Sequence, residues 1–251
     1  MSISRREAKL GKTKIVSLDL GMARAYALIG EGGIVLVDSG VPGDGIMKAL
    51  DKAGIDPTLL RLAIVTHAHV DHFGGLKSLT AANPGLSVAI GAFDASSLTE
   101  GTDADLVPLG AKGEFAAALT RVIAKVHSRL PRRPAATAPS IPIRLSGGES
   151  LIPYGVDAAV LSTPGHTRGS VSVIVPEAVD AEGKELGAAA IVGDLVMGGF
   201  VIHGRPSLPF FGLLEEIRSS LARLRERGVK VLFTGHGGPL DAQTVWRRFG
   251  L

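Results

Sequence analysis

One short stretch of the sequence concentrates side chains that can bind a metal ion. It reads Thr66-His67-Ala68-His69-Val70-Asp71-His72. Three imidazoles and one carboxylate fall within six positions, directly after an apolar run at 62–65 that is typical of a buried strand. Imidazole nitrogens and carboxylate oxygens are the usual ligands of zinc and similar divalent ions. The stretch therefore predicts a metal-binding loop, and the alternative is a polar loop that happens to be rich in histidine.

Residue types that bind metals recur after three later apolar runs. His166 follows Thr163-Pro164-Gly165, Asp194 follows Gly193, and His236 follows Thr234-Gly235. The chain has seven histidines, and five of them lie in these four turns, whereas chance would scatter them. Five imidazoles and two carboxylates are too many for one tetrahedral ion. They suit two ions that share one carboxylate, with room left for water.

The strands and helices that would hold these turns follow from the distribution of apolar and turn-forming residues. The expected strands cover about 15–18, 25–29, 34–37, 62–65, 87–90, 156–161, 171–175, 188–192 and 229–233. The expected helices cover about 44–53, 72–83, 113–130 and 213–227. Each candidate ligand thus lies just past the end of an expected strand, where an irregular turn can direct several side chains at one point.

Residues 91–142 interrupt this alternation. Apolar residues at spacings of three and four predict a helix at about 113–130, whose polar side is basic. The proline-rich stretch at 131–142 cannot form regular structure. We interpret the segment as an insertion that lies over the core and covers the site. The alternatives are a solvated amphipathic helix without functional contacts and a helix that lies on a membrane surface.

The composition bounds the class of protein. The chain has 251 residues, of which 45% are hydrophobic and 20% charged, as in an ordinary globular protein. The absence of cysteine excludes disulfides and thiolate ligands. A net charge of +3 does not by itself indicate nucleic-acid binding, and we expect none. Because residues 1–9 do not resemble a secretory signal and no stretch is long enough to span a membrane, we expect a cytoplasmic protein.

In these turns the sequence resembles the metallo-β-lactamase superfamily. The matching motifs are His67-Ala68-His69-Val70-Asp71-His72, Thr163-Pro164-Gly165-His166-Thr167, Gly193-Asp194 and Thr234-Gly235-His236, with Asp38 as a further match. They occur in the family's order between about residues 14 and 238. The resemblance implies an α/β fold, an αβ/βα four-layer sandwich in which two mixed β-sheets pack face to face with helices outside. It also implies a single domain over residues 1–251, with a metal pair at one edge.

The resemblance also implies a role for each candidate. The first ion would be held by His67, His69 and His166, and the second by Asp71, His72 and His236, with Asp194 as the bridge. Asp71 could in addition take up a proton and pass it on as the catalytic residue. Asp38 and Thr66 would orient the ligand loop from behind. The alternative for Asp38 is an ordinary turn residue at the end of a strand.

Such a centre predicts a metal-dependent hydrolase. A metal ion lowers the pKa of bound water from about 15.7 to about 7, so that hydroxide exists at neutral pH. We expect two divalent ions, zinc in the first place with iron or manganese as alternatives. The expected substrate is a small-molecule ester, lactone, thioester or phosphoester. The alternative functions are an oxidoreductase similar to the persulfide dioxygenases, with a single iron, and a metal-stabilised binding module without activity.

The choice of substrate is left open by the sequence. Two residues are candidates for substrate binding: His203 closely follows the Asp194 turn, and Arg168, two residues after His166, could bind an anionic group. A solvated arginine explains Arg168 equally well. Asp194 argues against β-lactam hydrolysis, because the β-lactamases proper usually lack the bridging aspartate. The sequence is compatible with a homo-oligomer.

Overall fold

The first half of the chain forms one mixed β-sheet in the computed structural model, which describes residues 11–21, 23–104, 106–111, 114–115, 142–199 and 204–251. Its strands are β1 (Thr13–Asp19), β2 (Arg24–Gly30), β3 (Gly33–Val37), β4 (Leu60–Val65), β5 (Ser87–Gly91) and β6 (Ile143–Leu145). The first three strands pair antiparallel, and β3 to β6 are parallel. The parallel strands β3 and β4 therefore end at the same edge of this sheet.

The second half of the chain forms a second mixed sheet. Its strands are β7 (Ala159–Ser162), β8 (Val171–Val179), β9 (Glu185–Gly193), β10 (Val231–Thr234) and β11 (Leu240–Asp241). The pair β9 and β10 is parallel, and the other neighbours are antiparallel. A parallel pairing of Thr13 and Lys14 in β1 with Ala178 and Val179 in β8 joins the two sheets along one margin.

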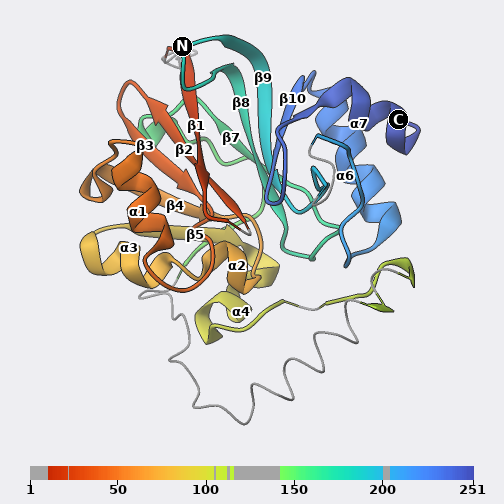
Figure 1. Ribbon diagram of the computed structural model, residues 1–251, viewed down its shortest axis with the longest axis horizontal. Helices are drawn as coiled ribbons and strands as arrows, with labels where there is room; N and C mark the ends of the chain where they lie inside the picture. The colour runs from red at the N-terminus through yellow and green to blue at the C-terminus, as the bar shows by residue number, and fades with distance from the viewer. Residues whose placement is uncertain (1–10, 22, 105, 112–113, 116–141, 200–203) are drawn as a thin grey trace, which may run out of the picture.

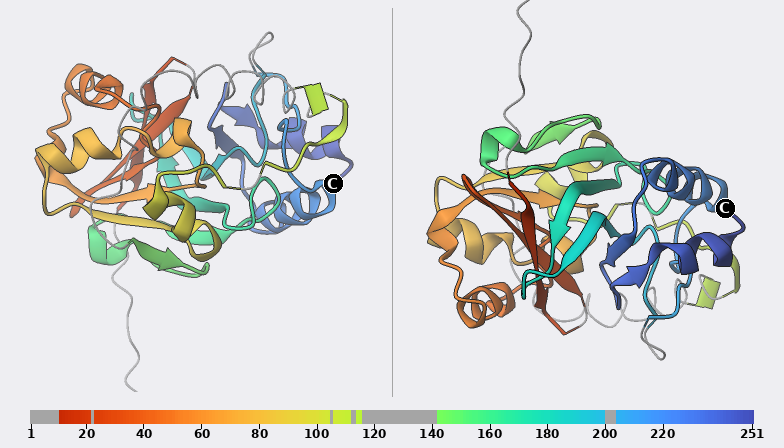
Figure 2. Two further views of the ribbon diagram at one scale, coloured as in Figure 1. Left: turned by 90° about the horizontal axis from the view of Figure 1, so that it is seen from below. Right: turned by 90° about the horizontal axis from the view of Figure 1, so that it is seen from above.

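Three apolar layers separate four layers of secondary structure (Figure 1). The middle apolar layer lies between the sheets and includes Tyr26 and Ile64 from the first sheet and Val173 and Ile191 from the second. Helices α1 (Gly45–Lys52) and α3 (Leu76–Ala82) cover the outer face of the first sheet, and α6 (Leu214–Glu226) and α7 (Ala242–Phe249) cover that of the second. Both views in Figure 2 keep the two helix pairs on opposite outer sides. The predicted αβ/βα four-layer sandwich of two mixed sheets is confirmed.

Strand β4 shows how the sequence determines this arrangement. It is buried on both faces between β3 and β5, which explains its uninterrupted apolar run from Leu62 to Val65. The odd and even positions divide between two layers: Ile64 faces the other sheet, and Ala63 and Val65 face the helices. The strand therefore delivers the residues that follow it to a fixed place at the sheet edge.

The prediction of one helix at about 72–83 is wrong in one respect, because two helices occupy this stretch. Helix α2 (Val70–Phe73) is followed by Gly74 and Gly75, and α3 begins at Leu76. The backbone after β3 lies against this break: a Cβ atom on Gly75 would come within 2.2 Å of the Ser39 carbonyl oxygen. The amide of Ser39 also donates to the carbonyl of His72 over 2.7 Å. Close approach of the two backbones interrupts the helix.

Several elements were not expected from the sequence. These are β6, β11, α7 and α4 (Ala95–Glu100), together with three short 3₁₀ turns at Pro57–Leu59, Ala92–Asp94 and Ile152–Tyr154. All but residues 114–115 of the expected helix at 113–130, and all but residue 142 of the proline-rich stretch, lie outside the described residues. In the described part of the chain, no helix has the length and apolar character that crossing a membrane requires.

The described beginning of segment 91–142 packs on the core. Ala95, Leu98 and Ala104 are buried in the layer beneath α1 and α3. The amide of Ala104 donates to the carbonyl of Ala68 over 2.6 Å, inside the histidine loop. This part of the segment lies directly beside the candidate site, and the proposal that the rest covers the site stays a prediction.

Candidate metal centre

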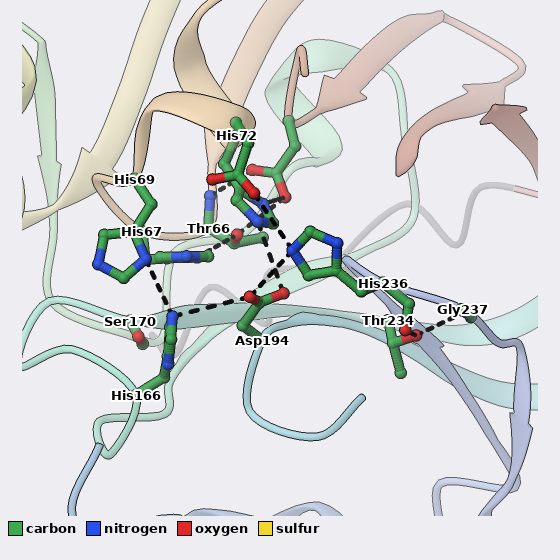
Figure 3. Close-up of polar contacts among 12 residues, drawn as sticks. Thr66, His67, His69, His72, His166, Ser170, Asp194, Thr234, His236 and Gly237 are labelled. Carbon is green, nitrogen blue, oxygen red and sulfur yellow. Dashed lines mark hydrogen bonds and ion pairs between the residues drawn. The ribbon is translucent and has the colours of Figure 1, made fainter. Parts of the chain in front are cut away.

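The seven expected ligands lie together at one edge of the sandwich. Figure 3 shows the five histidines and Asp194 with their side chains gathered around one point. They come from the loop after β4 and from the turns that follow β7, β9 and β10. Three groups of side chains each place one potential ligand atom per residue within 4.8 Å of one another: His67, His69 and His166; His67, His72 and Asp194; and Asp71, His72 and His236. The first and third groups are the two sets that the family resemblance assigned to separate ions.

Asp194 lies between the two sets. Its Oδ1 is 3.5 Å from His72 Nε2, and its Oδ2 is 3.7 Å from His166 Nε2 and 3.2 Å from His236 Nε2. On the other side of His236, Asp71 Oδ2 is 3.3 Å from the same Nε2. The side chain of Asp71 is 27% exposed, whereas that of Asp194 is 7% exposed. Asp194 is therefore the central carboxylate, and Asp71 is the one open to solvent.

The outer nitrogens of three imidazoles are fixed by hydrogen bonds. His72 Nδ1 donates to Asp38 Oδ2 over 2.9 Å, and His166 Nδ1 donates to the Phe211 carbonyl over 2.9 Å. The Thr66 hydroxyl donates to Asp38 Oδ2 over 2.8 Å, so at 3.0 Å it accepts the proton on His67 Nδ1. With the proton on Nδ1, each ring has a lone pair on Nε2 when the ring is neutral.

Several buried polar atoms of the cluster lack hydrogen-bond partners. In the described part of the chain, His67 Nε2, His69 Nε2, His72 Nε2 and Asp194 Oδ1 are buried and have no hydrogen-bond partner. A buried unpaired acceptor costs about 1–3 kcal/mol, which a bound cation would remove. His69 Nδ1 and His166 Nε2 face each other at 3.1 Å, a distance at which two lone pairs need a proton or a cation between them. The donor set therefore fits divalent metal ions.

Charge differs between the two sets. Burial lowers the pKa of His72, but Asp194 and Asp38 outweigh it and raise the pKa to about 9. Burial also lowers the pKa of His236, and Asp194 and Asp71 raise it to about 11. In the first set, burial and then His166 lower the pKa of His69 to about 3. The second set thus attracts positive charge, and the first presents neutral imidazoles.

The two carboxylates beside His236 are both held in their ionised form. Burial raises the pKa of Asp194, but His236 and then His72 hold that pKa well below its ordinary value. Burial also raises the pKa of Asp71, and its hydrogen bond with His236 brings the pKa below its ordinary value. Two ionised carboxylates within reach of one another favour a cation between them.

Asp38 is not one of the candidate ligands, but it is hydrogen-bonded to His72 in the second set and, through Thr66, linked to His67 in the first. It follows β3 with a positive φ of 62°, a backbone conformation in which Asp is among the better-tolerated residues. Its Oδ1 accepts the Thr66 amide over 2.7 Å, while Oδ2 accepts the Thr66 hydroxyl and His72 Nδ1. One carboxylate therefore orients His72 directly and His67 through Thr66.

Gly235 shows how closely the second set is packed. A Cβ atom at this position would come within 2.3 Å of Asp194 Oδ1 and 2.5 Å of His72 Cε1. On the far side of the same turn, the Tyr26 hydroxyl donates to the Thr234 carbonyl over 2.7 Å. The end of β10, where this turn begins, is thereby held to β2, the strand that carries Tyr26.

Asp94 was not expected to belong to the site. It is buried at the end of the 3₁₀ turn after β5, and its carboxylate accepts hydrogen bonds from Ala68, Thr167 and Gly169. These donors belong to the two loops that carry the first set. The signal was present in the sequence, since Asp94 is an acidic residue just past a strand, as Asp38 and Asp194 are.

The two candidate substrate-binding residues have different outcomes. His203 lies outside the described residues. Arg168 is exposed, and its guanidinium lies 4.8 Å from the centre of the Phe93 ring. Arg168 and Phe93 line a cavity of about 370 Å³ that also includes His166, Val107 and Leu213. Arg168 therefore lies at the wall of a cavity that shares a histidine with the first set.

Comparison with known proteins places this geometry in a family. The family model described as the metallo-beta-lactamase superfamily matches residues 18–236. The chain is 27% identical over 233 residues to metallo-beta-lactamase domain-containing protein 1 of Xenopus laevis, a match that spans 91% of this chain and 77% of the relative. It is 28% identical over 212 residues to acyl-coenzyme A thioesterase MBLAC2 of Gallus gallus, spanning 81% of this chain and 65% of the relative.

Solved structures share the fold. A motif mutant of a metallo-beta-lactamase from Cronobacter sakazakii has a TM-score of 0.59 at 23% identity, over 94% of this chain and 78% of that structure. A metallo-beta-lactamase family protein from Thermus thermophilus has a TM-score of 0.58 at 20% identity, over 94% and 76%. Since the family model spans most of the chain and includes all four turns that carry the candidate ligands, this protein belongs to the metallo-beta-lactamase superfamily.

Proposed function

We propose that this protein is a metal-dependent hydrolase with a dinuclear centre. The observation that supports this most directly is the position of Asp194, between a set of three imidazoles and a set of two imidazoles and a carboxylate. His67, His69 and His166 would hold one ion, Asp71, His72 and His236 the other, and Asp194 both. Zinc is the proposed ion, because imidazole and carboxylate are its usual ligands in cysteine-free sites.

The bound ions would supply Lewis acidity and lower the pKa of water into the neutral range. The chain's own contribution is to orient the ligands and to move a proton. Asp71 is suited to the second task, because its carboxylate is ionised and is 27% exposed, so that it can exchange a proton with solvent. Asp194 is buried and surrounded by imidazoles, which suits it to a fixed position.

The proposed substrate is an ester or thioester with an apolar acyl group. The cavity beside His166 is lined by three large apolar side chains that are unusually exposed, Phe93 at 69%, Val107 at 42% and Leu213 at 46%. Such a grouping next to a reactive centre favours an apolar part of a ligand. Arg168, at the same cavity, would bind an anionic group on the substrate. The thioesterase name of the Gallus gallus relative supports the thioester.

Metal analysis and a substrate panel test the proposal. Protein prepared without chelator should contain about two ions per chain. The panel includes a p-nitrophenyl ester, an acyl-coenzyme A thioester, a lactone, a phosphodiester and a β-lactam. The ester and thioester should be hydrolysed, and turnover should be lost on chelation and restored by zinc. A single iron per chain with oxygen consumption on a persulfide would instead support the dioxygenase alternative.

Asp194→Ala tests the shared carboxylate, with Asp51→Ala on the exposed surface of α1 as the control. The first variant should lose metal and turnover, and the second should keep both. A variant at Asp194 that retains two ions and full turnover would contradict the bridging role.

A further inference from the structure

Asp94 is a buried acidic side chain between the two loops that carry the first set of ligands. The residue is 2% exposed. Oδ2 accepts the Ala68 amide over 2.9 Å and the Thr167 hydroxyl over 2.7 Å, and Oδ1 accepts the Gly169 amide over 2.9 Å. Ala68 lies between His67 and His69, and Thr167 directly follows His166. One carboxylate therefore joins the neighbours of all three imidazoles.

The environment of Asp94 is specific for a carboxylate. Three N–H and O–H donors from two separate loops point at its two oxygens. In the part of the chain that the structure describes, no lysine or arginine forms an ion pair with it. The backbone is also close, since a Cβ atom on Gly169 would come within 2.4 Å of Asp94 Oδ1. Hydrogen bonds to an ionised acceptor are stronger than neutral ones, so this carboxylate holds both loops firmly.

We propose that Asp94 is a positioning residue for the first metal ion. It fixes the loop of His67 and His69 relative to the loop of His166, and so maintains the 3.1 Å approach of His69 Nδ1 to His166 Nε2. The proposal rests on the proposed function in that it requires this set to bind an ion. Residues that do not bind the metal but orient its ligands typically contribute about 10–100-fold to metal affinity.

The effect should be selective. The hydrogen bonds of Asp94 reach the first set, while the second set is oriented by Asp38 through His72 and by the turn after β10. Loss of the Asp94 carboxylate should therefore lower the affinity for the first ion by about 10–100-fold and leave the affinity for the second ion unchanged. A general loss of structure would lower the affinity for both ions.

Asp94→Ala and Asp94→Asn test the proposal, with Asp56→Ala as the matched control. Asp56 also accepts a backbone amide and a threonine hydroxyl, at 2.8 and 2.7 Å, but in an exposed turn that precedes β4. The affinity for zinc is measured by competition with a chromophoric chelator. Cobalt absorption spectra then report the ligand geometry of each ion. The same substitutions in a His236→Ala background isolate the first set, and circular dichroism checks the fold.

The expected result is loss of the first ion in Asp94→Ala, a smaller loss in Asp94→Asn, which keeps one acceptor oxygen, and no change in Asp56→Ala. Two ions bound with wild-type affinity in both Asp94 variants would overturn the proposal, as would equal loss of both ions. If Asp94→Ala fails to fold, Asp94→Asn decides. A wild-type protein that binds one ion refutes the dinuclear proposal, and unchanged affinity for that ion in Asp94→Asn then overturns the role of Asp94 as well.

Discussion

Asp38→Asn should switch the tautomer of His72 and thereby remove a ligand from the second set. The substitution preserves shape, and Asn is among the residues that tolerate the positive φ of 62° at this position. It changes one carboxylate oxygen into an NH₂ group, which donates and cannot accept. The backbone amide of Thr66, now bonded to Oδ1, cannot change its role, so the amide oxygen of Asn must face it.

The NH₂ group then faces the Thr66 hydroxyl and His72 Nδ1. The hydroxyl can rotate and accept. The neutral form of His72, which is the form that can bind a metal ion, can accept only by moving its proton from Nδ1 to Nε2, the atom that faces Asp194 at 3.5 Å. A protonated Nε2 cannot bind a metal ion.

The size of the effect follows from the bond that is lost. Metal binding requires the proton of His72 to return to Nδ1, where its N–H would face the NH₂ group of the introduced Asn. The hydrogen bond that Nδ1 donates to the charged Asp38 carboxylate is then lost, and such a bond contributes about 1.5–3 kcal/mol. Since about 1.4 kcal/mol is a factor of ten, the affinity for the second ion should fall by about 10- to 150-fold. The first ion should be affected less, because Thr66 can still accept from His67.

Chelator competition measures the affinity, and long-range ¹⁵N–¹H correlation spectra of the zinc-free protein report the tautomer at pH 10, above the His72 pKa of about 9, where the ring is neutral. Asp241→Asn is the control, because Asp241 accepts the amide and hydroxyl of Thr244, both at 2.8 Å, at the beginning of α7. If Asp38→Asn binds both ions with wild-type affinity, or if His72 keeps its proton on Nδ1, the reasoning is refuted.

Three further predictions concern neighbouring features. Gly235→Ala should abolish binding of the second ion and lower stability by about 1–3 kcal/mol, measured by chelator competition and thermal unfolding, because the new methyl group overlaps Asp194 and His72. Zinc uptake at pH 7.5 should release about two protons per chain, since His72 and His236, with pKa values of about 9 and 11, are protonated in the metal-free protein. Affinity should accordingly fall as the pH is lowered, and calorimetry in two buffers of different ionisation enthalpy counts the protons; zero release would contradict the assigned charges. Arg168→Ala should raise KM about 10-fold for an anionic thioester and leave KM for a neutral ester unchanged in steady-state assays.

The sequence was most informative where local pattern and position coincide. The apolar run before Thr66 predicted β4, and the turns at His166, Asp194 and His236 were placed after strands because Gly and Pro mark the strand ends. The family resemblance then supplied the layered arrangement. The same resemblance implied the division of the ligands into two sets.

Features that depend on distant contacts were missed. The break between α2 and α3 depends on the backbone near Ser39, which periodicity along one helix cannot report. The short strands β6 and β11 form only because long neighbours offer hydrogen bonds. Helix α7 could have been recognised, since Asp241 caps a segment in which Val245, Trp246 and Phe249 form one apolar face.

The division of the fold into two sheets has a consequence for assembly. Each set of ligands combines side chains from both halves of the chain: His69 meets His166 across 97 positions of sequence, and Asp71 meets His236. Neither half can present a complete set on its own. If the centre holds ions as proposed, its complete ligand sets form only when the two sheets dock, and bound ions would stabilise the docked state.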